Sequence, residues 1–242
     1  MTNPDERASA RRRLHRMVFA AIASVAAFSS AAFASPPVVV ELFQSQGCSS
    51  CPPANENILT LVDRPDLLVL SFGVTYWDRL GWKDTFASHE NTQRQYAYAN
   101  GGLKRRNVAT PQVVINGYVD IVGNNRSELV RAISGAKLPS DAPTLALSGL
   151  KLSISAATAP VGGADVWLVR YDPRIVQVPI KAGENGGRTL PHRNVVRELV
   201  RVGGWSGKAA TFQLPAATDP AYRTAILIQG SSGGPMITAL KS

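Results

Sequence analysis

The sequence predicts an α/β domain followed by an all-β antiparallel sandwich domain. Before residue 139, apolar β-branched runs alternate with segments of helical periodicity, which is typical of strands joined by crossover helices. After residue 143, short apolar runs are separated by Gly- and Pro-rich turns, which favours antiparallel strands. A polar stretch bracketed by prolines separates the two patterns. We therefore divide the chain into residues 1–34, 35–139 and 144–242.

Residues 1–34 predict a signal peptide. An arginine-rich segment precedes an Ala-rich apolar run that contains no acid, and a small-x-small cleavage pattern ends at Ala34. We expect cleavage between Ala34 and Ser35, which makes the mature protein periplasmic or secreted, with no stable membrane insertion after the leader is removed. A pair of adjacent arginines in the leader leaves the twin-arginine export route open beside the general one.

Charge and cysteine content narrow the class of protein. The chain has a formal net charge of +9, and removing a leader with five arginines and two acids leaves +6. The basic residues are scattered rather than grouped with aromatic residues, so a nucleic-acid partner is not indicated. Both cysteines lie in one short motif, and export is the setting in which disulfides persist.

The stretch at 38–61 predicts a strand, a Cys-x-x-Cys motif and a helix in direct succession. The first amides of a helix lack partners and carry partial positive charge, which stabilises a thiolate. We predict Cys48 as the nucleophile and Cys51 as the resolving thiol. A purely structural disulfide across so short a loop would raise the free energy of unfolding by only about 2 kcal/mol through loop entropy. A zinc site needs about four ligands, and the sequence has no second cysteine pair.

Further elements follow in order. Residues 66–75 predict a second strand, parallel to the first, and an aromatic loop with Trp77 leads into a polar helix at 84–100. Trp77 is a candidate substrate contact, and packing of its ring onto the core is the alternative. Asn116-Gly117 predicts a hairpin between two short strands, with Thr110-Pro111 directly before it.

The second part of the chain predicts short strands that start near residue 151. They are residues 151–156, 165–171, 175–180, 195–202, 209–214 and 224–229. The polar stretch at 183–192 predicts a loop that braces the two domains, and an acid–base pair of Glu184 and His192 is the alternative. The Ser-Ser-Gly-Gly sequence at 231–234 predicts a turn.

This order of elements resembles the thioredoxin fold. The resemblance implies that Pro111 follows a cis peptide bond and that Thr110 presents backbone groups to a substrate disulfide. In that superfamily a buried acid before the motif accepts a proton from the resolving thiol, and Glu41 is its nearest counterpart here. The intervening turn is one residue longer in this chain, so the direction in which Glu41 points stays open.

Four stretches resemble, more specifically, a bacterial family of exported thioredoxin-like proteins catalogued as domain of unknown function 1223. They are VELFQSQGCSSCPPA, TYWDRLGWKDTFAS, TPQVVING and GENGGRTLPHRNVVREL. The resemblance spans nearly the whole mature chain. It implies a fold without an established substrate, and a fold alone does not fix an activity.

We therefore expect an exported thiol–disulfide oxidoreductase that needs no cofactor. Its partners would be protein thiols or disulfides, or a low-molecular-weight thiol, and the direction of electron flow stays open. A metal-handling protein is one alternative, with Cu(I) bound by Cys48, Cys51 and His89. A non-catalytic interaction module is the other.

Overall fold

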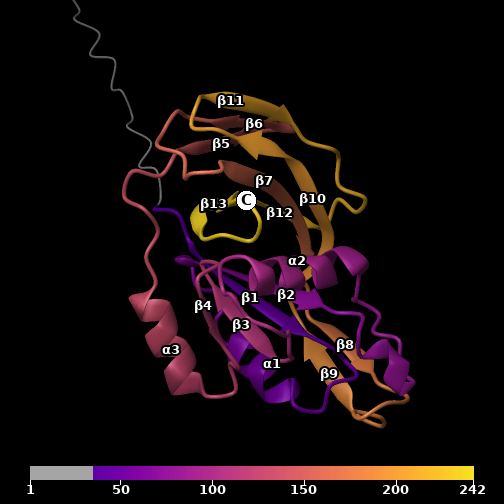
Figure 1. The fold of residues 1–242 in the computed structure, drawn as a ribbon. Coiled ribbons are helices and arrows are strands. Elements are labelled where there is room, and N and C mark those ends of the chain that lie inside the picture. The colour runs from indigo at the N-terminus through magenta and orange to yellow at the C-terminus, as the bar shows by residue number, and fades with distance from the viewer. Residues whose placement is uncertain (1–34) are drawn as a thin grey trace, which may run out of the picture. The chain divides into compact units, whose positions relative to one another are not determined.

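One continuous mixed sheet runs through most of the chain. The computed structural model describes residues 35–242, so the predicted leader and most of its cleavage signal lie outside the described residues. In chain order the elements are β1 (Val38–Gln44), α1 (Pro52–Leu59), β2 (Leu67–Gly73), the 3-10 helix η2 (Asp78–Leu80), α2 (His89–Asn100), β3 (Gln112–Ile115), β4 (Val119–Ile121), α3 (Arg126–Gly135), β5 (Leu145–Ser148), β6 (Lys151–Ile154), β7 (Ala164–Asp172), β8 (Val176–Pro179), β9 (Thr189–His192), β10 (Val195–Trp205), β11 (Ala210–Gln213), β12 (Arg223–Gly230) and β13 (Met236–Lys241). The large sheet has the order β13-β12-β7-β10-β2-β1-β3-β4 (Figure 1).

The predicted fold class, an α/β thioredoxin-like domain followed by a separate sandwich, is wrong. Strands from both predicted domains belong to the same 8-stranded sheet, and residues 35–242 form one compact unit. The thioredoxin-like description is likewise not confirmed, because β2 is an interior strand of a larger, mostly antiparallel sheet. The proposed boundary at residues 139–144 stays a prediction.

Strand β10 joins the two halves because it covers what would otherwise be an exposed edge of β2. Val195 in β10 pairs in parallel with Ser71 in β2, and the Ser71 N–H donates to the Asn194 carbonyl at 3.0 Å. The Asn194 side chain also donates to the Val69 carbonyl at 2.9 Å. An uncovered edge exposes unpaired backbone groups to water and to other chains, so pairing with β10 completes β2.

Side chains of β1 alternate between two buried clusters on opposite faces of the sheet. Val40 and Leu42 pack with α1 and α3, whereas Val39 and Phe43 pack with α2 on the other face. Figure 1 shows α1 and α3 on one side of β1 and α2 on the other. The α2-side cluster also contains residues of β7, β10, β12 and β13, so one core spans both predicted domains.

Strands β11, β6 and β5 form a second sheet, and β8 and β9 form a hairpin. The second sheet packs on the face of β7 and β12 that lies away from α2, through a cluster that includes Leu152, Val166 and Ile226. All six strands predicted after residue 144 correspond to observed strands. The sequence pattern does not predict three further strands, β5, β9 and β13. In the described part of the chain, no helix is both long and apolar enough to cross a membrane.

The predicted turns at Asn116-Gly117 and at 231–234 are both observed, and they lie against neighbouring backbone. Asn116 and Gly117 both have positive φ, and the Tyr118 N–H closes their turn by donating to the Ile115 carbonyl at 3.2 Å, so three residues separate the paired positions Ile115 and Val119. The Gly102 N–H donates to the Gly233 carbonyl at 3.1 Å, and the Met236 N–H donates to the Asn116 carbonyl at 2.9 Å. The C-terminal turn is therefore docked on the end of α2 and on the hairpin.

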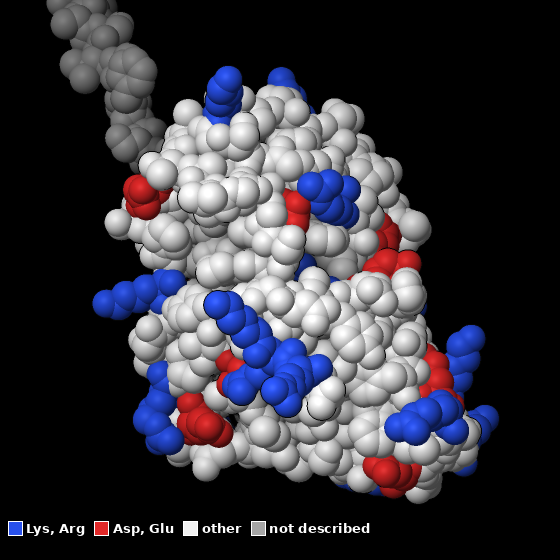
Figure 2. Space-filling model, viewed as in Figure 1, with Lys and Arg blue, Asp and Glu red and all other residues white. Residues whose placement is uncertain are grey.

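Charges of both signs are spread over the molecular surface. Figure 2 shows the largest group of basic side chains in the lower half of the face in view, with an acidic side chain beside it. This arrangement fits the mildly basic composition of residues 35–242.

Candidate functional site

Cys48 and Cys51 form a disulfide at the start of α1. Their Cα atoms are 5.5 Å apart, and Cys51 is the N-cap residue of the helix. Pro52 and Pro53 occupy the first two helical positions, where a missing N–H costs no hydrogen bond and the fixed φ suits the helix. The helix therefore begins directly after the motif.

Hydroxyl groups surround the sulfur of Cys48. The Thr110 hydroxyl donates to Cys48 Sγ at 3.2 Å, and Ser50 Oγ lies 3.2 Å from the same sulfur. The Trp77 indole N–H donates to Thr110 Oγ1 at 2.7 Å, which directs the hydroxyl hydrogen of Thr110 toward Cys48. The Thr110–Pro111 peptide bond is cis. The structure thus brings four predicted site residues, Cys48, Trp77, Thr110 and Pro111, together around the disulfide, and Cys51 completes it.

Trp77 contributes to the site through its ring nitrogen rather than as an exposed surface. Its side chain is half-buried and packs against the core cluster on the α2 side of the sheet. Helix α2 supports the same loop, because Gln95 Nε2 donates to the Ala109 carbonyl at 2.9 Å. Both contacts hold Thr110 against Cys48.

The disulfide is covered in this conformation. Cys48 is 0% exposed and Cys51 is 1% exposed, whereas Ser49 and Ser50 between them are exposed. The cover next to the Cys48 sulfur is polar, made of hydroxyl and carbonyl groups of Ser50 and Thr110. A partner molecule therefore reaches the sulfurs only if part of this cover moves.

The turn before Cys48 is fixed by the segment that follows η2. Trp82 Nε1 donates to Gln46 Oε1 at 2.9 Å, and the Gln46 N–H donates to Asp84 Oδ2 at 2.7 Å. Asp84 also accepts from the Phe86 N–H at 2.7 Å. Burial raises the pKa of Asp84, and these two backbone donors partly oppose that rise.

The loop between β8 and β9 lies on the motif from the other side. Asn185 is fully buried, and its amide donates to the carbonyls of Gln46 and Cys48 at 2.9 and 2.8 Å. Glu184 Oε2 accepts from both the N–H and the hydroxyl of Ser49, at 3.0 and 2.7 Å. The Ser49 N–H and then its hydroxyl hold the pKa of Glu184 below its ordinary value.

A cluster of neutral polar groups lies beneath the first turn of α1. Gln44 Nε2 donates to Asn55 Oδ1 at 3.0 Å and to Ser71 Oγ at 2.7 Å, and it lies 3.5 Å from His192 Nδ1. His192 Nε2 has no hydrogen-bond partner among the described residues. Burial lowers the pKa of His192 to about 4, so the imidazole is neutral at pH 7. His192 does not pair with Glu184, which binds Ser49 instead.

Glu41 is not brought to the cysteines. It lies on the α2 face of β1, where its carboxylate forms an ion pair with Arg94 at 2.7 Å and accepts a hydrogen bond from the Tyr98 hydroxyl. The α1 face of β1 instead carries Val40, Leu42 and Gln44. The predicted proton transfer between Glu41 and Cys51 is therefore wrong, because strand alternation turns the carboxylate to the opposite face of the sheet.

The predicted copper ligands are not assembled either. His89 is an exposed residue at the start of α2 and lines a hollow with Arg94 and Trp167. Among residues 35–242, no three His, Cys, Asp or Glu side chains are grouped closely enough to hold a metal ion. The donor set of the copper alternative is therefore reduced to the two sulfurs.

Several residues that hold the motif were not predicted as site residues. Gln46, Trp82 and Asn185 bind the motif or its preceding turn through side-chain amides and an indole nitrogen. The only sequence signal for Asn185 is its place in the polar stretch at 183–192. Its contact with the Cys48 carbonyl has no sequence signature, because the two residues are 137 positions apart.

Fold and site together define a mostly β protein with a Cys-x-x-Cys disulfide at a helix N-terminus. The chain belongs to the family described as protein of unknown function (DUF1223), whose model matches residues 39–229, and the predicted family is thereby confirmed. A crystal structure of a protein from Agrobacterium tumefaciens is 33% identical with a TM-score of 0.69, covering 87% of this chain and 95% of that one. HBP35 of Porphyromonas gingivalis is 10% identical with a TM-score of 0.48, covering 86% of this chain and 75% of that one. No curated protein sequence matches the chain.

Replacing Glu41 with Gln will destabilise the fold without slowing exchange of the Cys48–Cys51 disulfide with dithiothreitol per folded molecule. The change leaves the Arg94 guanidinium, 2% exposed, without its carboxylate, and loss of a buried ion-pair partner costs about 3–5 kcal/mol. Urea unfolding monitored by circular dichroism measures the loss. Asp66→Asn is the control, because its ion pair with Arg64 is exposed and is worth under about 1 kcal/mol. Slower exchange by folded Glu41→Gln protein would contradict this structural role.

The buried imidazole of His192 will make stability fall as the pH drops from about 6.5 toward 4. The unfolded chain binds the proton near the ordinary pKa of 6.5, whereas the folded chain resists protonation down to about 4. Between pH 7 and pH 5 this difference removes about 2 kcal/mol of unfolding free energy. Urea unfolding at the two pH values measures it.

His192→Gln removes this part of the pH dependence, and His89→Gln, which changes an exposed histidine, keeps it. An unchanged difference between pH 7 and pH 5 in His192→Gln protein would contradict the assignment.

Proposed function

We propose that the protein is an exported thiol–disulfide oxidoreductase that works through Cys48 and Cys51. The observation that carries the proposal is the surroundings of Cys48 Sγ, which lies at the start of α1 with two hydroxyl groups at 3.2 Å. A plain structural staple has no use for such hydrogen-bond donors. Export follows from the predicted leader and stays part of the proposal.

The hydroxyl groups suit a thiolate at Cys48. A thiolate accepts hydrogen bonds, and donors to the charged form lower the pKa of a thiol. With Pro52 and Pro53 at its first two positions, α1 offers few free N–H groups to a nearby anion. Donation by the Thr110 hydroxyl, joined by the Ser50 hydroxyl when that group turns from the Thr110 carbonyl to the sulfur, therefore replaces much of what backbone amides supply at other helix N-termini.

The exchange itself balances in two steps. A partner thiolate attacks Cys48 Sγ, the Cys48–Cys51 bond breaks, and a mixed disulfide forms while Cys51 leaves as a thiolate and takes a proton from solvent. A second partner thiol then loses its proton and attacks the partner sulfur, which gives a partner disulfide and the reduced protein. In the reverse direction, the Cys48 thiolate attacks a partner disulfide and Cys51 resolves the adduct. Protein thiols and low-molecular-weight thiols both fit this scheme.

Access to the sulfurs requires an opening step. Ser49 is exposed and is tethered to Glu184 through both its N–H and its hydroxyl. Release of this tether frees the turn that carries Cys48, so the sulfur can rotate toward solvent. We call this contact between Glu184 and Ser49 the latch, because it holds the motif turn in the closed position.

A non-catalytic interaction module is the rival function, and the burial of both cysteines favours it. In that case the disulfide closes a turn permanently and the sulfurs never meet a partner. The two functions differ in whether Cys48 forms a mixed disulfide.

Cys51→Ala protein will accumulate a mixed disulfide through Cys48 in the producing cell. The resolving thiol is then absent, so the adduct with the partner persists. Because the sequence has two cysteines, any adduct of this variant runs through Cys48. Non-reducing electrophoresis followed by mass spectrometry identifies it.

Cys48→Ser protein, which keeps Cys51, is the matched control and is expected to form little adduct. Absence of any adduct in Cys51→Ala protein, together with no exchange by wild-type protein toward a model disulfide, would leave the non-catalytic module as the function.

Glu184→Ala will speed reduction of the Cys48–Cys51 disulfide by dithiothreitol severalfold. The change removes both hydrogen bonds that tether Ser49, so the motif turn opens more often. Glu56→Ala is the control, because it removes the same charge from an exposed position on α1. Acid quenching at timed intervals, followed by alkylation of the free cysteines in the denatured protein and mass spectrometry, measures the rate, and equal rates in both variants would argue against the latch.

A further inference from the structure

A pocket of about 340 Å³ opens at the end of the large sheet where the two halves of the chain meet. It arises because β10 begins at Val195, opposite Ser71, and leaves the earlier residues of β2 without a neighbouring strand on that side. Side chains bind the carbonyls left free there. Asn194 donates to the Val69 carbonyl at 2.9 Å, and Lys241 Nζ donates to the Leu67 carbonyl at 2.5 Å.

Two cations line this pocket, Arg223 at the start of β12 and Lys241 at the end of β13. Neither takes part in an ion pair within residues 35–242. The Lys241 ammonium group donates to the Leu67 carbonyl and, at 3.2 Å, to the Arg64 carbonyl. One of its three N–H groups therefore remains free to bind a ligand.

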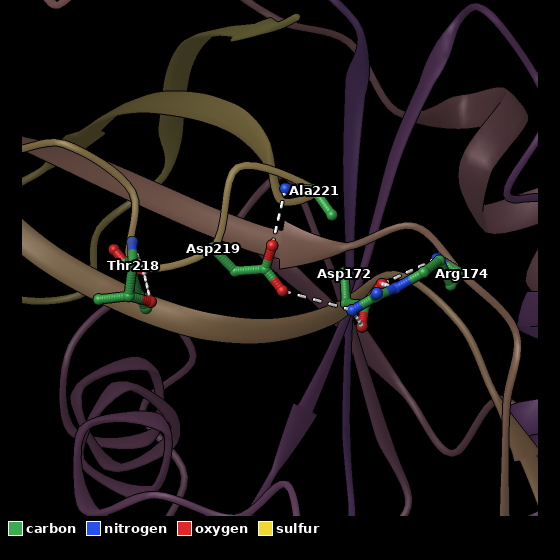
Figure 3. Close-up of polar contacts among 6 residues, drawn as sticks. Asp172, Arg174, Thr218, Asp219 and Ala221 are labelled. Carbon is green, nitrogen blue, oxygen red and sulfur yellow. Dashed lines mark hydrogen bonds and ion pairs between the residues drawn. The ribbon is translucent and has the colours of Figure 1, made fainter.

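The acids whose charges act on these cations, Asp63 on Arg223 and Asp66 on Lys241, are already paired with other arginines, as is Asp172, which follows the lining residue Tyr171. Asp63 binds Arg193 through two hydrogen bonds of 2.7 Å. On the other side, Arg174 pairs with Asp172 at 2.7 Å and lies 3.6 Å from Asp219. Figure 3 shows the Arg174 guanidinium bridging these two carboxylates, with Asp219 also accepting from the Ala221 N–H.

Asp66 is also paired, because it accepts two hydrogen bonds from the Arg64 guanidinium. Burial lowers the pKa of Lys241, the charge of Asp66 partly opposes this, and the charge of Arg223 adds a smaller lowering. Burial also raises the pKa of Tyr171, so its hydroxyl is a neutral donor at the pocket wall. Two cations and a hydroxyl thus line a hollow in which neither cation forms an ion pair with a carboxylate of the described residues.

We propose that this pocket binds a small oxyanion, the carboxylate or phosphate of a small molecule, between Arg223 and Lys241. Guanidinium and ammonium groups are the usual partners of such anions, and charge-assisted hydrogen bonds are about twice as strong as neutral ones. The volume lies at the lower end of small-molecule pockets. The pocket is built from the beginning of β2, whereas the disulfide lies beyond the end of β1, so this site is separate from the thiol chemistry.

Isothermal titration of the full chain with inorganic phosphate and with succinate, each in 0.15 M chloride, tests the proposal. We expect saturable 1:1 binding of one of them with a Kd below about 1 mM. The probe that binds identifies the anion as phosphate or carboxylate.

Arg223→Gln and Lys241→Met are each expected to raise the Kd about tenfold or more, since loss of one charge-assisted hydrogen bond has that effect. Arg106→Gln, which removes an exposed arginine outside the pocket, is expected to change the Kd less than about twofold. Lys241 also supports β2, so Arg223→Gln carries the test if Lys241→Met fails to fold. No saturable binding of either probe, or equal affinity in Arg223→Gln and wild-type protein, would overturn the proposal.

Discussion

The parallel contact between β10 and β2 joins the two halves of the chain, and both candidate sites, the disulfide and the pocket at the end of the sheet, depend on it. Val195 meets Ser71, and from this point β10 continues into an antiparallel sheet with β7, β12 and β13. The hairpin of β8 and β9 precedes β10 directly, so the same contact positions that hairpin beside α1. Without it, β2 would be an open edge and the motif would lack its outer cover.

Segments far apart in the chain converge on the disulfide, and each has a definable task. The prolines after Cys51 start α1, Thr110 and Trp77 orient a hydroxyl hydrogen toward Cys48, and Asn185 fixes the Cys48 carbonyl. All of these groups are neutral. His192, buried beneath the helix, is kept unprotonated by burial, and the carboxylates of Asp84 and Glu184 bind the motif turn rather than the sulfurs. The chemistry of the site is therefore governed by hydrogen bonding to sulfur more than by formal charge.

Local sequence signals predict the elements of this fold well and their assembly poorly. The Asn-Gly hairpin, the proline-led helix and six later strands are all visible in patterns of fewer than fifteen residues. The joining of both halves into one sheet depends on the contact of Asn194 and Val195 with β2. Asn194 and its partner Val69 are 125 positions apart in the chain. No periodicity encodes such a partner. The direction of Glu41 illustrates the same limit, since a shift of one residue along a strand reverses its face.

The order in which the chain is made has a consequence for the covered disulfide. Ser49 and Glu184 are 135 positions apart, so a chain that emerges N-terminus first presents both cysteines long before the loop that encloses them. Oxidation of this pair is easiest on the incomplete chain, when nothing shields the sulfurs. The last third of the polypeptide carries the loop that covers the motif, so an oxidant reaches the two cysteines more readily before that part of the chain has folded than after it.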